Sequence, residues 1–378
     1  MKHLILILSL LTLSGCHNSS KNNSAGINTR NLGVSAVSFY VGTYTGSGSR
    51  GIYKYLMYSD GRIELKSLAA ETENPSFLAL STNRNFLLAV NENSPEGFVE
   101  SFRIKGDSLV RVSRSPSGGI HPCFVAINEN DYVLTANYSS GTVGLLKLDS
   151  TGKLSELLDV HQHTGSGTTN RQRGPHAHSA HFEPGTSKVI SVDLGTNEIW
   201  FSDLDTMQEK LLPSNPQKLR MDTGVGPRHM VFHPNGKWIY VVNELNSTVT
   251  LVKRNIRGEF EKGPSFTSLP ADYEGPNYCA DIRISSDGRF VYASNRGHNS
   301  IAIFKTDEDK GILNPVGNQS TCGDWPRNFT LSPAEDYLLV ANQNSDNIVS
   351  FKRDMKTGYI EPVDTIKTPS PVCILFLR

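Results

Sequence analysis

The chain has 378 residues, with 37 basic and 37 acidic side chains and therefore a formal net charge of zero. This balance argues against general binding to nucleic acid, which draws much of its affinity from a cationic excess. With 37% hydrophobic and 20% charged residues, the chain is expected to fold rather than to remain disordered. Its 32 glycines and 19 prolines favour many turns and argue against an all-helical fold.

The N-terminal segment resembles an export signal rather than part of a folded domain. Its apolar run, from Leu4 to Leu13, is short for a membrane span but suits the core of a signal peptide. The run ends in Leu13-Ser14-Gly15-Cys16, which resembles the bacterial lipobox, a motif cleaved before its cysteine so that the cysteine can be acylated. Residues 1–15 are therefore expected to be a lipoprotein signal peptide, and a secretory signal with an incidental cysteine is the alternative. The Asn- and Ser-rich segment 16–36 is expected to be a flexible tether.

These features predict an exported bacterial lipoprotein that is anchored to a membrane through lipid on Cys16. The anchor would hold the rest of the chain on the periplasmic or the cell-surface side.

A repeated module fills the remainder of the chain. Its clearest copy has a short apolar run from Pro227 to Phe232, the turn Pro234-Asn235-Gly236, a β-rich run that ends at Asn243, and a third run from Ser247 to Val252. This pattern predicts three antiparallel strands joined by tight turns. A fourth strand is expected in the less regular stretch before the next copy.

The residue that ends the second strand of each copy marks the period of the repeat. Successive marks lie 46 to 56 residues apart, at Thr43, Asn91, Asn137, Asp193, Asn243, Asn295 and Asn342. Four-stranded units at roughly this spacing are typical of a β-propeller. Residues 37–378 are therefore expected to form an all-β, seven-bladed β-propeller of four-stranded antiparallel blades.

The two ends of the repeat region are expected to close the ring. The segment from Phe39 to Thr43 resembles a second strand without a first, and the segment from Pro371 to Phe376 resembles a first strand with nothing after it. Pairing of these N- and C-terminal strands would complete one blade, with the C-terminal strand innermost, and would protect the sheet edges.

Two positions of the repeat are expected to meet at one end of the central channel, because the first strand of a blade leaves a rim and the second returns to it. The position at the start of the innermost strands holds Ser76, Cys123, His178, Arg228, Ala280, Arg327 and Val372. The position after the marks holds Tyr44, Glu92, Tyr138, Leu194, Glu244, Arg296 and Gln343. Charged groups there cost desolvation free energy unless they are paired or hydrated. Their clustering in the fourth to seventh blades indicates either a working site or an ion-pair ring.

Several strings within the repeats resemble the lactonase family of seven-bladed propellers. They are Gly226-Pro227-Arg228-His229-Met230-Val231-Phe232-His233-Pro234, Val242-Asn243-Glu244-Leu245-Asn246-Ser247-Thr248-Val249, Ser294-Asn295-Arg296 and Tyr40-Val41-Gly42-Thr43-Tyr44-Thr45. The family contains the propeller type of 6-phosphogluconolactonase and the fungal carboxy-muconate lactonizing enzymes. The resemblance implies hydrolysis of a sugar lactone to the open acid, without a cofactor. A muconate-type cycloisomerase and a non-catalytic binding or scaffold lipoprotein are the alternatives.

The resemblance also implies which residues form the active site. The family's proposed His, two Arg and Glu correspond to His178, Arg228, Arg296 and Glu244, and Arg327 joins them through its place in the repeat. Glu244 is expected to act as general base on a water and Arg228 to stabilise the oxyanion. His178 is expected to orient water or to protonate the ring oxygen. Arg296 and Arg327 are expected to bind the acidic substituent of a small anionic lactone.

Five histidines lie close together in the sequence, between His161 and His181. Imidazoles bind zinc, copper and nickel, so a metal site is one interpretation. The favoured interpretation is a loop from His163 to Gly174 with solvated histidines, which overhangs the channel mouth and holds no metal. Glu92 is a second candidate for the base, although it is expected across the ring from the arginines.

Four cysteines remain after Cys16, and in an exported protein they could form two disulfides. Their irregular spacing and the lack of a CxxC motif favour small core residues instead. The four are Cys123, Cys279, Cys322 and Cys373.

Overall fold

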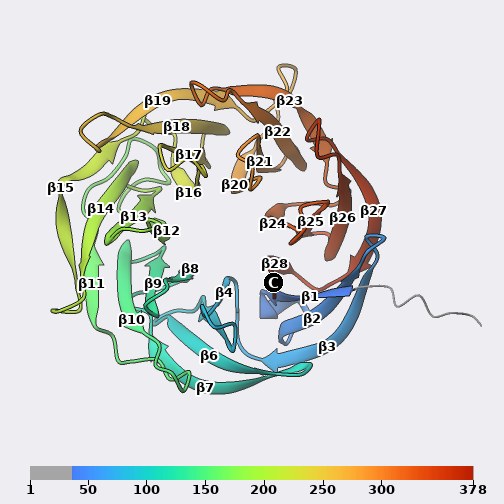
Figure 1. Ribbon diagram of the computed structural model, residues 1–378, viewed down its shortest axis with the longest axis horizontal. Coiled ribbons are helices and arrows are strands. Elements are labelled where there is room, and N and C mark those ends of the chain that lie inside the picture. Colours follow the sequence, from blue (N-terminus) through green and yellow to red (C-terminus); the bar gives the residue numbers. More distant parts are fainter. Residues whose placement is uncertain (1–35, 378) are drawn as a thin grey trace, which may run out of the picture. The chain divides into compact units, whose positions relative to one another are not determined.

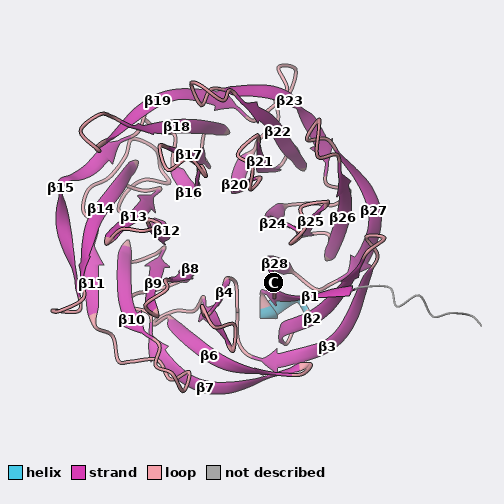
Figure 2. Ribbon diagram, viewed as in Figure 1, coloured by secondary structure: helices cyan, strands magenta, loops and turns pink. Residues whose placement is uncertain are grey.

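The computed structural model describes residues 36–377, which form seven four-stranded antiparallel sheets arranged in a ring (Figures 1 and 2). Within this part of the chain, the helical structure is limited to the short 3₁₀ turn η1 (Thr45–Ser47). The prediction of an all-β, seven-bladed propeller is therefore confirmed. The predicted signal peptide, the lipidated Cys16 and the tether up to residue 35 lie outside the described residues. Among residues 36–377, no helix has the length and apolar character needed to cross a membrane.

The strands nearest the axis of the ring and the strands that follow them carry the residues predicted to form the site (Figure 1). The innermost strands are β4 (Leu78–Leu80), β8 (Pro122–Ile127), β12 (Ala177–Phe182), β16 (Pro227–Phe232), β20 (Tyr278–Ile284), β24 (Pro326–Leu331) and β28 (Pro371–Phe376). The second strands are β1 (Ala36–Thr43), β5 (Phe86–Asn91), β9 (Tyr132–Asn137), β13 (Lys188–Asp193), β17 (Trp238–Asn243), β21 (Phe290–Arg296) and β25 (Tyr337–Asn342). Six of the seven sequence marks end a second strand, and Asn295 lies one residue before such an end.

The outer half of each blade completes the four-stranded sheet. The third strands are β2 (Gly51–Tyr58), β6 (Phe98–Lys105), β10 (Thr142–Lys147), β14 (Glu198–Asp205), β18 (Thr248–Arg254), β22 (Ser300–Thr306) and β26 (Asn347–Arg353). The outermost strands are β3 (Ile63–Glu71), β7 (Ser108–Pro116), β11 (Asp159–Gln162), β15 (Lys210–Arg220), β19 (Phe260–Thr267), β23 (Leu313–Ser320) and β27 (Ile360–Lys367).

The first blade is closed by strands from the two ends of the described chain. Its strand order is β28-β1-β2-β3, and β28 pairs with β1 in antiparallel register, for example Val41 opposite Ile374. This pairing covers the inner edge of β1, which would otherwise expose unpaired N–H and C=O groups. The predicted closure, with the C-terminal strand innermost, is confirmed.

The tight turn between the first and second strands has the same hydrogen bonds in several blades. In the Pro-Asn-Gly copy, His233 N–H donates to the carbonyl of Trp238, and Gly236 N–H donates back to the carbonyl of His233. Gly236 has a φ of 68°, a left-handed conformation that glycine adopts without steric cost. In the seventh blade Glu335 takes this place with a φ of 58°, so the turn persists without its usual glycine.

Apolar clusters lie between neighbouring blades rather than in one central core. Each of the seven blade-to-blade interfaces within residues 36–377 has its own cluster. Between the fifth and sixth blades, Tyr240 and Val242 of β17 belong to the same cluster as Val291 of β21. Second strands such as β5, β9, β17 and β25 are buried along their whole length, so their sequences are nearly continuous apolar runs that end in a polar residue.

The cysteines form no disulfide among the described residues. Cys123, Cys279 and Cys373 are buried, as expected of small core residues, whereas Cys322 is exposed. The expectation that all four lie in the core is therefore wrong for Cys322, which occupies the loop between β23 and β24.

Candidate active site

A repeated β-bulge orients the residues at the start of the innermost strands. In the pairing of β16 with β17, Pro227 lies opposite Asn243 and His229 lies opposite Val242, so one residue between them is left out of the ladder. The same shift occurs in four other blades, and the five omitted residues are Cys123, His178, Arg228, Arg327 and Val372. A bulge bends its strand and redirects the side chain of the extra residue. The scaffold therefore repeats this local geometry in five different blades.

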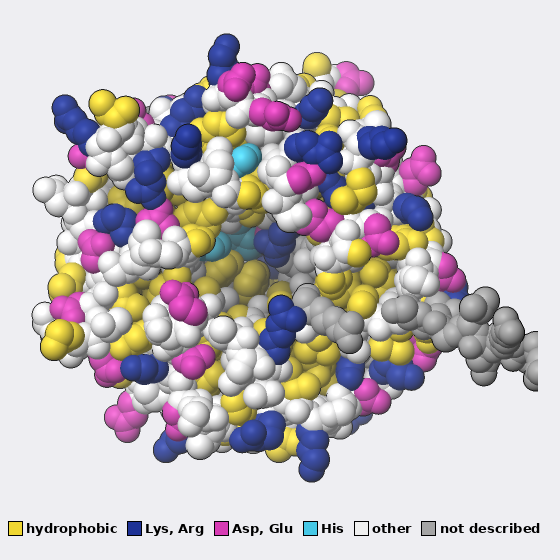
Figure 3. Space-filling view, in the orientation of Figure 1, with side chains coloured by type: hydrophobic (Ala, Val, Ile, Leu, Met, Phe, Trp, Pro, Cys, Tyr) yellow, Lys and Arg dark blue, Asp and Glu magenta, His cyan; other side chains and the backbone are white. Residues whose placement is uncertain are grey.

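Three of the redirected side chains, Cys123, His178 and Arg327, meet residues from the ends of the second strands around one cavity of about 180 Å³. Histidine and basic side chains are visible within the central hollow of the face shown in Figure 3. The cavity is lined by Glu92, Cys123, Tyr138, Arg171, His178, Glu244, Arg296 and Arg327. Four of the five residues predicted to form the site therefore share this cavity. Glu92, which was expected to lie across the ring from the arginines, lines the same cavity.

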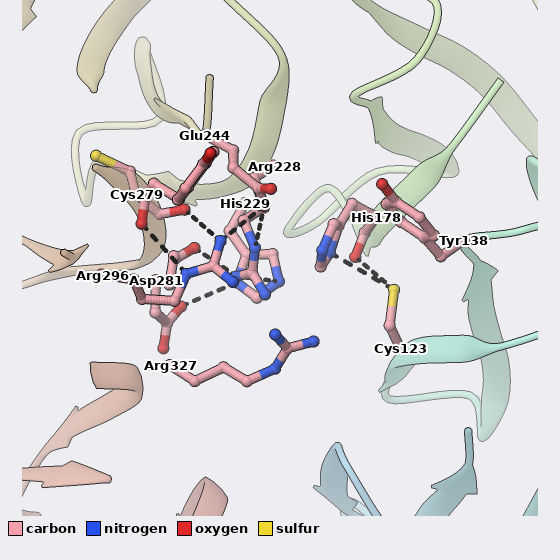
Figure 4. Close-up of polar contacts among 12 residues, drawn as sticks. Cys123, Tyr138, His178, Arg228, His229, Glu244, Cys279, Asp281, Arg296 and Arg327 are labelled. Carbon is pink, nitrogen blue, oxygen red and sulfur yellow. Dashed lines mark hydrogen bonds and ion pairs between the residues drawn. The ribbon is translucent and has the colours of Figure 1, made fainter. Parts of the chain in front are cut away.

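Arg228, the fifth predicted residue, borders a smaller recess next to the cavity. The recess also touches Glu92, Cys123 and Arg327, which line both spaces. Arg228 is 2% exposed, and Figure 4 shows it beside Glu244 and above His229. The sequence correctly places Arg228 near Glu244 but does not reveal that it lies outside the main cavity.

Glu244 is in contact with three arginines, of which Arg228 and Arg296 are labelled in Figure 4. Its Oε2 atom lies 2.8 Å from Nη2 of Arg296 and 3.2 Å from Nε of Arg228. The contact with Arg228 is an ion pair without the alignment of a hydrogen bond. Its Oε1 atom accepts a hydrogen bond of 3.0 Å from Nη2 of Arg171. Both carboxylate oxygens are thus in contact with guanidinium groups.

The charge state of Glu244 follows from two opposing effects. Burial raises the pKa of the Glu244 carboxyl, but Arg296, Arg228, His178 and Arg171 together outweigh burial and hold this pKa well below its ordinary value. Glu244 is therefore a carboxylate at neutral pH, and its basicity depends on how many of the three arginines stay in contact with it.

Arg327 belongs to a second polar chain on the other side of the cavity. Its Nη2 donates to the phenol oxygen of Tyr44 at 2.8 Å, and the Tyr44 hydroxyl donates to Oε2 of Glu92 at 2.8 Å. Burial raises the pKa of Tyr44, so its phenol keeps the proton that this donation requires. Among the described residues, Tyr44 is the one hydrogen-bond acceptor of the Arg327 guanidinium. The remaining N–H groups of Arg327 are available to a ligand in the cavity.

His178 is a neutral imidazole in this site. Burial, followed by Arg228 and His229, lowers the pKa of His178 well below its ordinary value. Its Nδ1 lies 3.5 Å from Sγ of Cys123, and burial raises the pKa of this thiol, which keeps its proton. If the thiol donates its proton to Nδ1, the imidazole proton lies on Nε2, and the ring can then donate from Nε2.

A buried polar network below the cavity holds Arg228 in place. Arg228 donates from Nη1 to the carbonyl of Ala280 at 2.5 Å and contacts Nε2 of His229 at 3.3 Å. Nδ1 of His229 lies 3.0 Å from Oδ1 of the fully buried Asp281, which fixes the proton of His229 on Nδ1. Asn328 donates to the other oxygen of Asp281 at 2.7 Å. This network gives Arg228 one orientation, next to Glu244.

The clustered histidines have structural contacts instead of a metal-binding arrangement. Within residues 36–377, no group of three or more His, Cys, Asp or Glu side chains is positioned to hold a metal ion. His163 is 1% exposed, lies 2.8 Å from Asp193 and stacks on Trp200, so the expectation of solvated histidines is wrong for it. His163 and its partners fix the start of the loop that continues to Gly174.

His181, deeper along β12, provides a stability prediction. Burial lowers its pKa to about 3, with Arg283 adding to the shift and Asp281 opposing it. In the unfolded chain this histidine has a pKa of 6.5, so it binds a proton at a higher pH there than in the folded chain. The free energy of unfolding should therefore fall below pH 6.5 by up to about 1.4 kcal/mol per pH unit. Urea unfolding of the wild type and His181→Gln at about pH 7.5 and pH 5 measures this effect. The stability advantage of the wild type should shrink by about 2 kcal/mol, and an unchanged advantage would contradict the assignment.

Sequence reasoning assigned no role to three contributors to the cavity. Arg171 lies in an irregular loop outside the repeat, and Tyr138 and Cys123 occupy repeat positions without carrying a charge. The only signal for Arg171 was the expectation that its loop overhangs the channel mouth, and the hydrogen bond from Arg171 to Glu244 agrees with that expectation.

The chain matches a known protein family over nearly the whole propeller. The family model described as lactonase, 7-bladed beta-propeller, matches residues 38–376. The chain is a member of this lactonase family. The expected family membership is thus confirmed, and with it the classification of the protein as a lactonase-type hydrolase.

Individual relatives span nearly the whole propeller. A 6-phosphogluconolactonase of Bacillus subtilis is 36% identical over 345 residues, which cover 90% of this chain and 98% of the relative. A periplasmic gluconolactonase of Pseudomonas aeruginosa has a structure with a TM-score of 0.86 at 29% identity, covering 91% of this chain and 99% of that one. A putative 6-phosphogluconolactonase of Bacteroides fragilis gives a TM-score of 0.85 at 33% identity, covering 90% and 98%.

Proposed function

We propose that this lactonase-family protein hydrolyses an anionic sugar lactone to the open acid in the cavity that contains Glu244. The observation that carries the proposal is the pairing of a buried, arginine-held carboxylate with a neutral histidine around one cavity. The relatives whose names describe a 6-phosphogluconolactonase and a gluconolactonase support a sugar lactone as the substrate.

The reaction adds water across the ester bond of the lactone. The oxygen of the water bonds to the carbonyl carbon, the bond from that carbon to the ring oxygen breaks, and the ring oxygen receives the proton that the base removed from the water. A lactone is an activated ester, so a positioned base and an oxyanion donor are sufficient and no serine nucleophile is needed.

Glu244 is the proposed general base. Arg228 and Arg296 hold its Oε2, which leaves Oε1 as the atom that can take a proton from water. In the structure Arg171 donates to Oε1, so the base is available when Arg171 turns to another partner.

The oxyanion donor that fits the cavity best is Arg327. It lines the cavity and keeps N–H groups that are not committed to other described residues. Arg228, which the sequence suggested for this role, borders the recess and contacts Glu244, so we assign it to positioning that carboxylate. Arg296 lines the cavity and orients Glu244 at the same time.

His178 is proposed to donate a hydrogen bond from Nε2 to the ring oxygen as the ring opens. Its lowered pKa means that it acts as a neutral donor at pH 7 rather than as an imidazolium. Cys123 supports this role by occupying Nδ1.

A panel of lactones tests the proposed function. The purified protein is supplied with glucono-δ-lactone, its 6-phosphate and a carboxymuconolactone, and acid release above the spontaneous rate is followed in a pH-stat. Turnover of a sugar lactone is expected. Turnover of the muconolactone alone would identify a muconate-type enzyme, and no turnover of any of the three would favour a binding or scaffold protein.

Export and lipid anchoring through Cys16 remain part of the proposal. They are supported by the lipobox-like string Leu13-Ser14-Gly15-Cys16 and by the description of the Pseudomonas aeruginosa neighbour as periplasmic.

A further inference from the structure

The loop between His163 and Gly174 is anchored near its C-terminal end. Gln172 is fully buried, and its Nε2 donates to the carbonyl of Leu194 at 2.8 Å and to Oδ1 of Asn197 at 3.1 Å. Gln172 also closes the loop through its backbone, which accepts from Gly167 N–H at 2.8 Å and donates to the carbonyl of Thr169 at 2.9 Å. The residue directly before Gln172 therefore has a fixed backbone position.

Arg171 is that residue, and its side chain extends from the loop to the mouth of the cavity. Its Nη2 donates to Oε1 of Glu244 at 3.0 Å and to the hydroxyl of Tyr138 at 2.9 Å. The Arg171 side chain is 49% exposed, whereas those of Arg228 and Arg296 are 3% and 5% exposed. Arg171 is thus the solvent-facing member of the three arginines that contact Glu244.

This difference in exposure indicates different roles for the three arginines. An ion pair made by a half-exposed side chain is worth little, so an incoming anion can replace it at low cost. A guanidinium binds phosphate or carboxylate with two parallel hydrogen bonds, which is stronger than the single donor that Glu244 Oε1 accepts. A sugar lactone with its carbonyl beside Glu244 and Arg327 would direct its distal substituent toward the mouth, where Arg171 lies.

We propose that Arg171 is a specificity-determining residue that leaves Oε1 of Glu244 and binds the distal anionic group of the lactone, either phosphate or carboxylate. The inference rests on the proposed function and adds a substrate class to it. The exchange has a second consequence, because the same movement frees Oε1 to take the proton from water. Loss of one cation contact also weakens the effect that holds the pKa of Glu244 low, while a bound substrate increases burial, which raises that pKa.

The test compares Arg171→Ala with Arg173→Ala. Arg173 is exposed in the same loop, and its guanidinium donates to Asn170 rather than to the site, so its removal controls for changes in the loop. Steady-state kinetics use three sugar lactones that differ in the distal group: glucono-δ-lactone, its 6-phosphate and a glucarolactone with a free carboxylate. Calorimetry with 6-phosphogluconate and glucarate measures binding without catalysis.

Arg171→Ala is expected to lower kcat/KM by about 10- to 100-fold for the lactone with the preferred anionic group, mainly through KM. The uncharged lactone should change by less than about 3-fold, and Arg173→Ala should match the wild type on all three substrates. The anionic lactone that loses most identifies the distal group as phosphate or as carboxylate.

Equal losses for charged and uncharged lactones would overturn the proposal and reduce Arg171 to a positioning residue for Glu244. Wild-type selectivity in Arg171→Ala would also overturn it. If the wild type hydrolysed only the uncharged lactone and bound neither sugar acid, the proposed role of Arg171 would be refuted. The proposed lactone hydrolysis would still be supported. If no lactone were hydrolysed but a sugar acid bound more weakly to Arg171→Ala than to the wild type, the role of Arg171 in binding the anionic group would be supported. The proposed hydrolysis would be refuted.

Discussion

Glu244→Gln is expected to lower kcat/KM for the sugar lactone by at least about 1000-fold, the largest effect predicted for any single residue of the site. The amide cannot accept a proton from water, and it leaves Arg228 and Arg296 without their shared counter-charge. Initial rates of acid release, corrected for spontaneous hydrolysis, measure the loss. Circular dichroism and thermal unfolding should show an intact fold that melts cooperatively at a lower temperature, because buried guanidinium groups have lost an anionic partner.

Glu92→Gln is the matched comparison for this experiment. Glu92 lines the same cavity but accepts its hydrogen bond from the hydroxyl of Tyr44 and has no arginine ion pair among the described residues. A much smaller loss, about 10-fold or less, is expected for Glu92→Gln. Wild-type rates in Glu244→Gln together with an inactive Glu92→Gln would transfer the role of base to Glu92.

Arg327→Met is expected to lower kcat by about 100- to 1000-fold with little change in KM, which is the signature of an interaction made mainly in the transition state. Methionine fills much of the space of the arginine stem but has no N–H group to donate to the oxyanion. The expectation follows from the uncommitted donors of Arg327 in the cavity. Single-turnover measurements separate the chemical step from product release.

Tyr44→Phe distinguishes the charge of Arg327 from its positioning. It removes the hydroxyl that accepts from Arg327 and donates to Glu92 but keeps the guanidinium in place. A loss of about 10-fold or less is expected. If Tyr44→Phe and Arg327→Met were equally impaired, or if Arg327→Met mainly raised KM, the oxyanion role would be wrong and Arg327 would be a ground-state binder.

The sequence alone was sufficient to predict the ring and four of the charged or titratable side chains that line its cavity, His178, Glu244, Arg296 and Arg327. A propeller repeats one local pattern of strand, turn and strand, so its blade number can be counted from marks such as Asn243 and Asn295. The closure of β1 by β28 followed from two incomplete modules at the ends of the repeat. The clustering of His178 and Glu244 at one mouth followed from the direction in which successive strands run.

The tertiary structure determined which of these side chains line the cavity and which hold Glu244 in position. Arg228 occupies the same bulge position as His178 and Arg327, but its contacts with Ala280, His229 and Glu244 hold it outside the main cavity. Arg171 comes from a loop that belongs to no repeat, so its contact with Glu244 depends on how Gln172 anchors that loop to the neighbouring turn. Local sequence sets strand and turn, but the direction of a side chain at a bulge or in a loop depends on packing with residues far away in the chain.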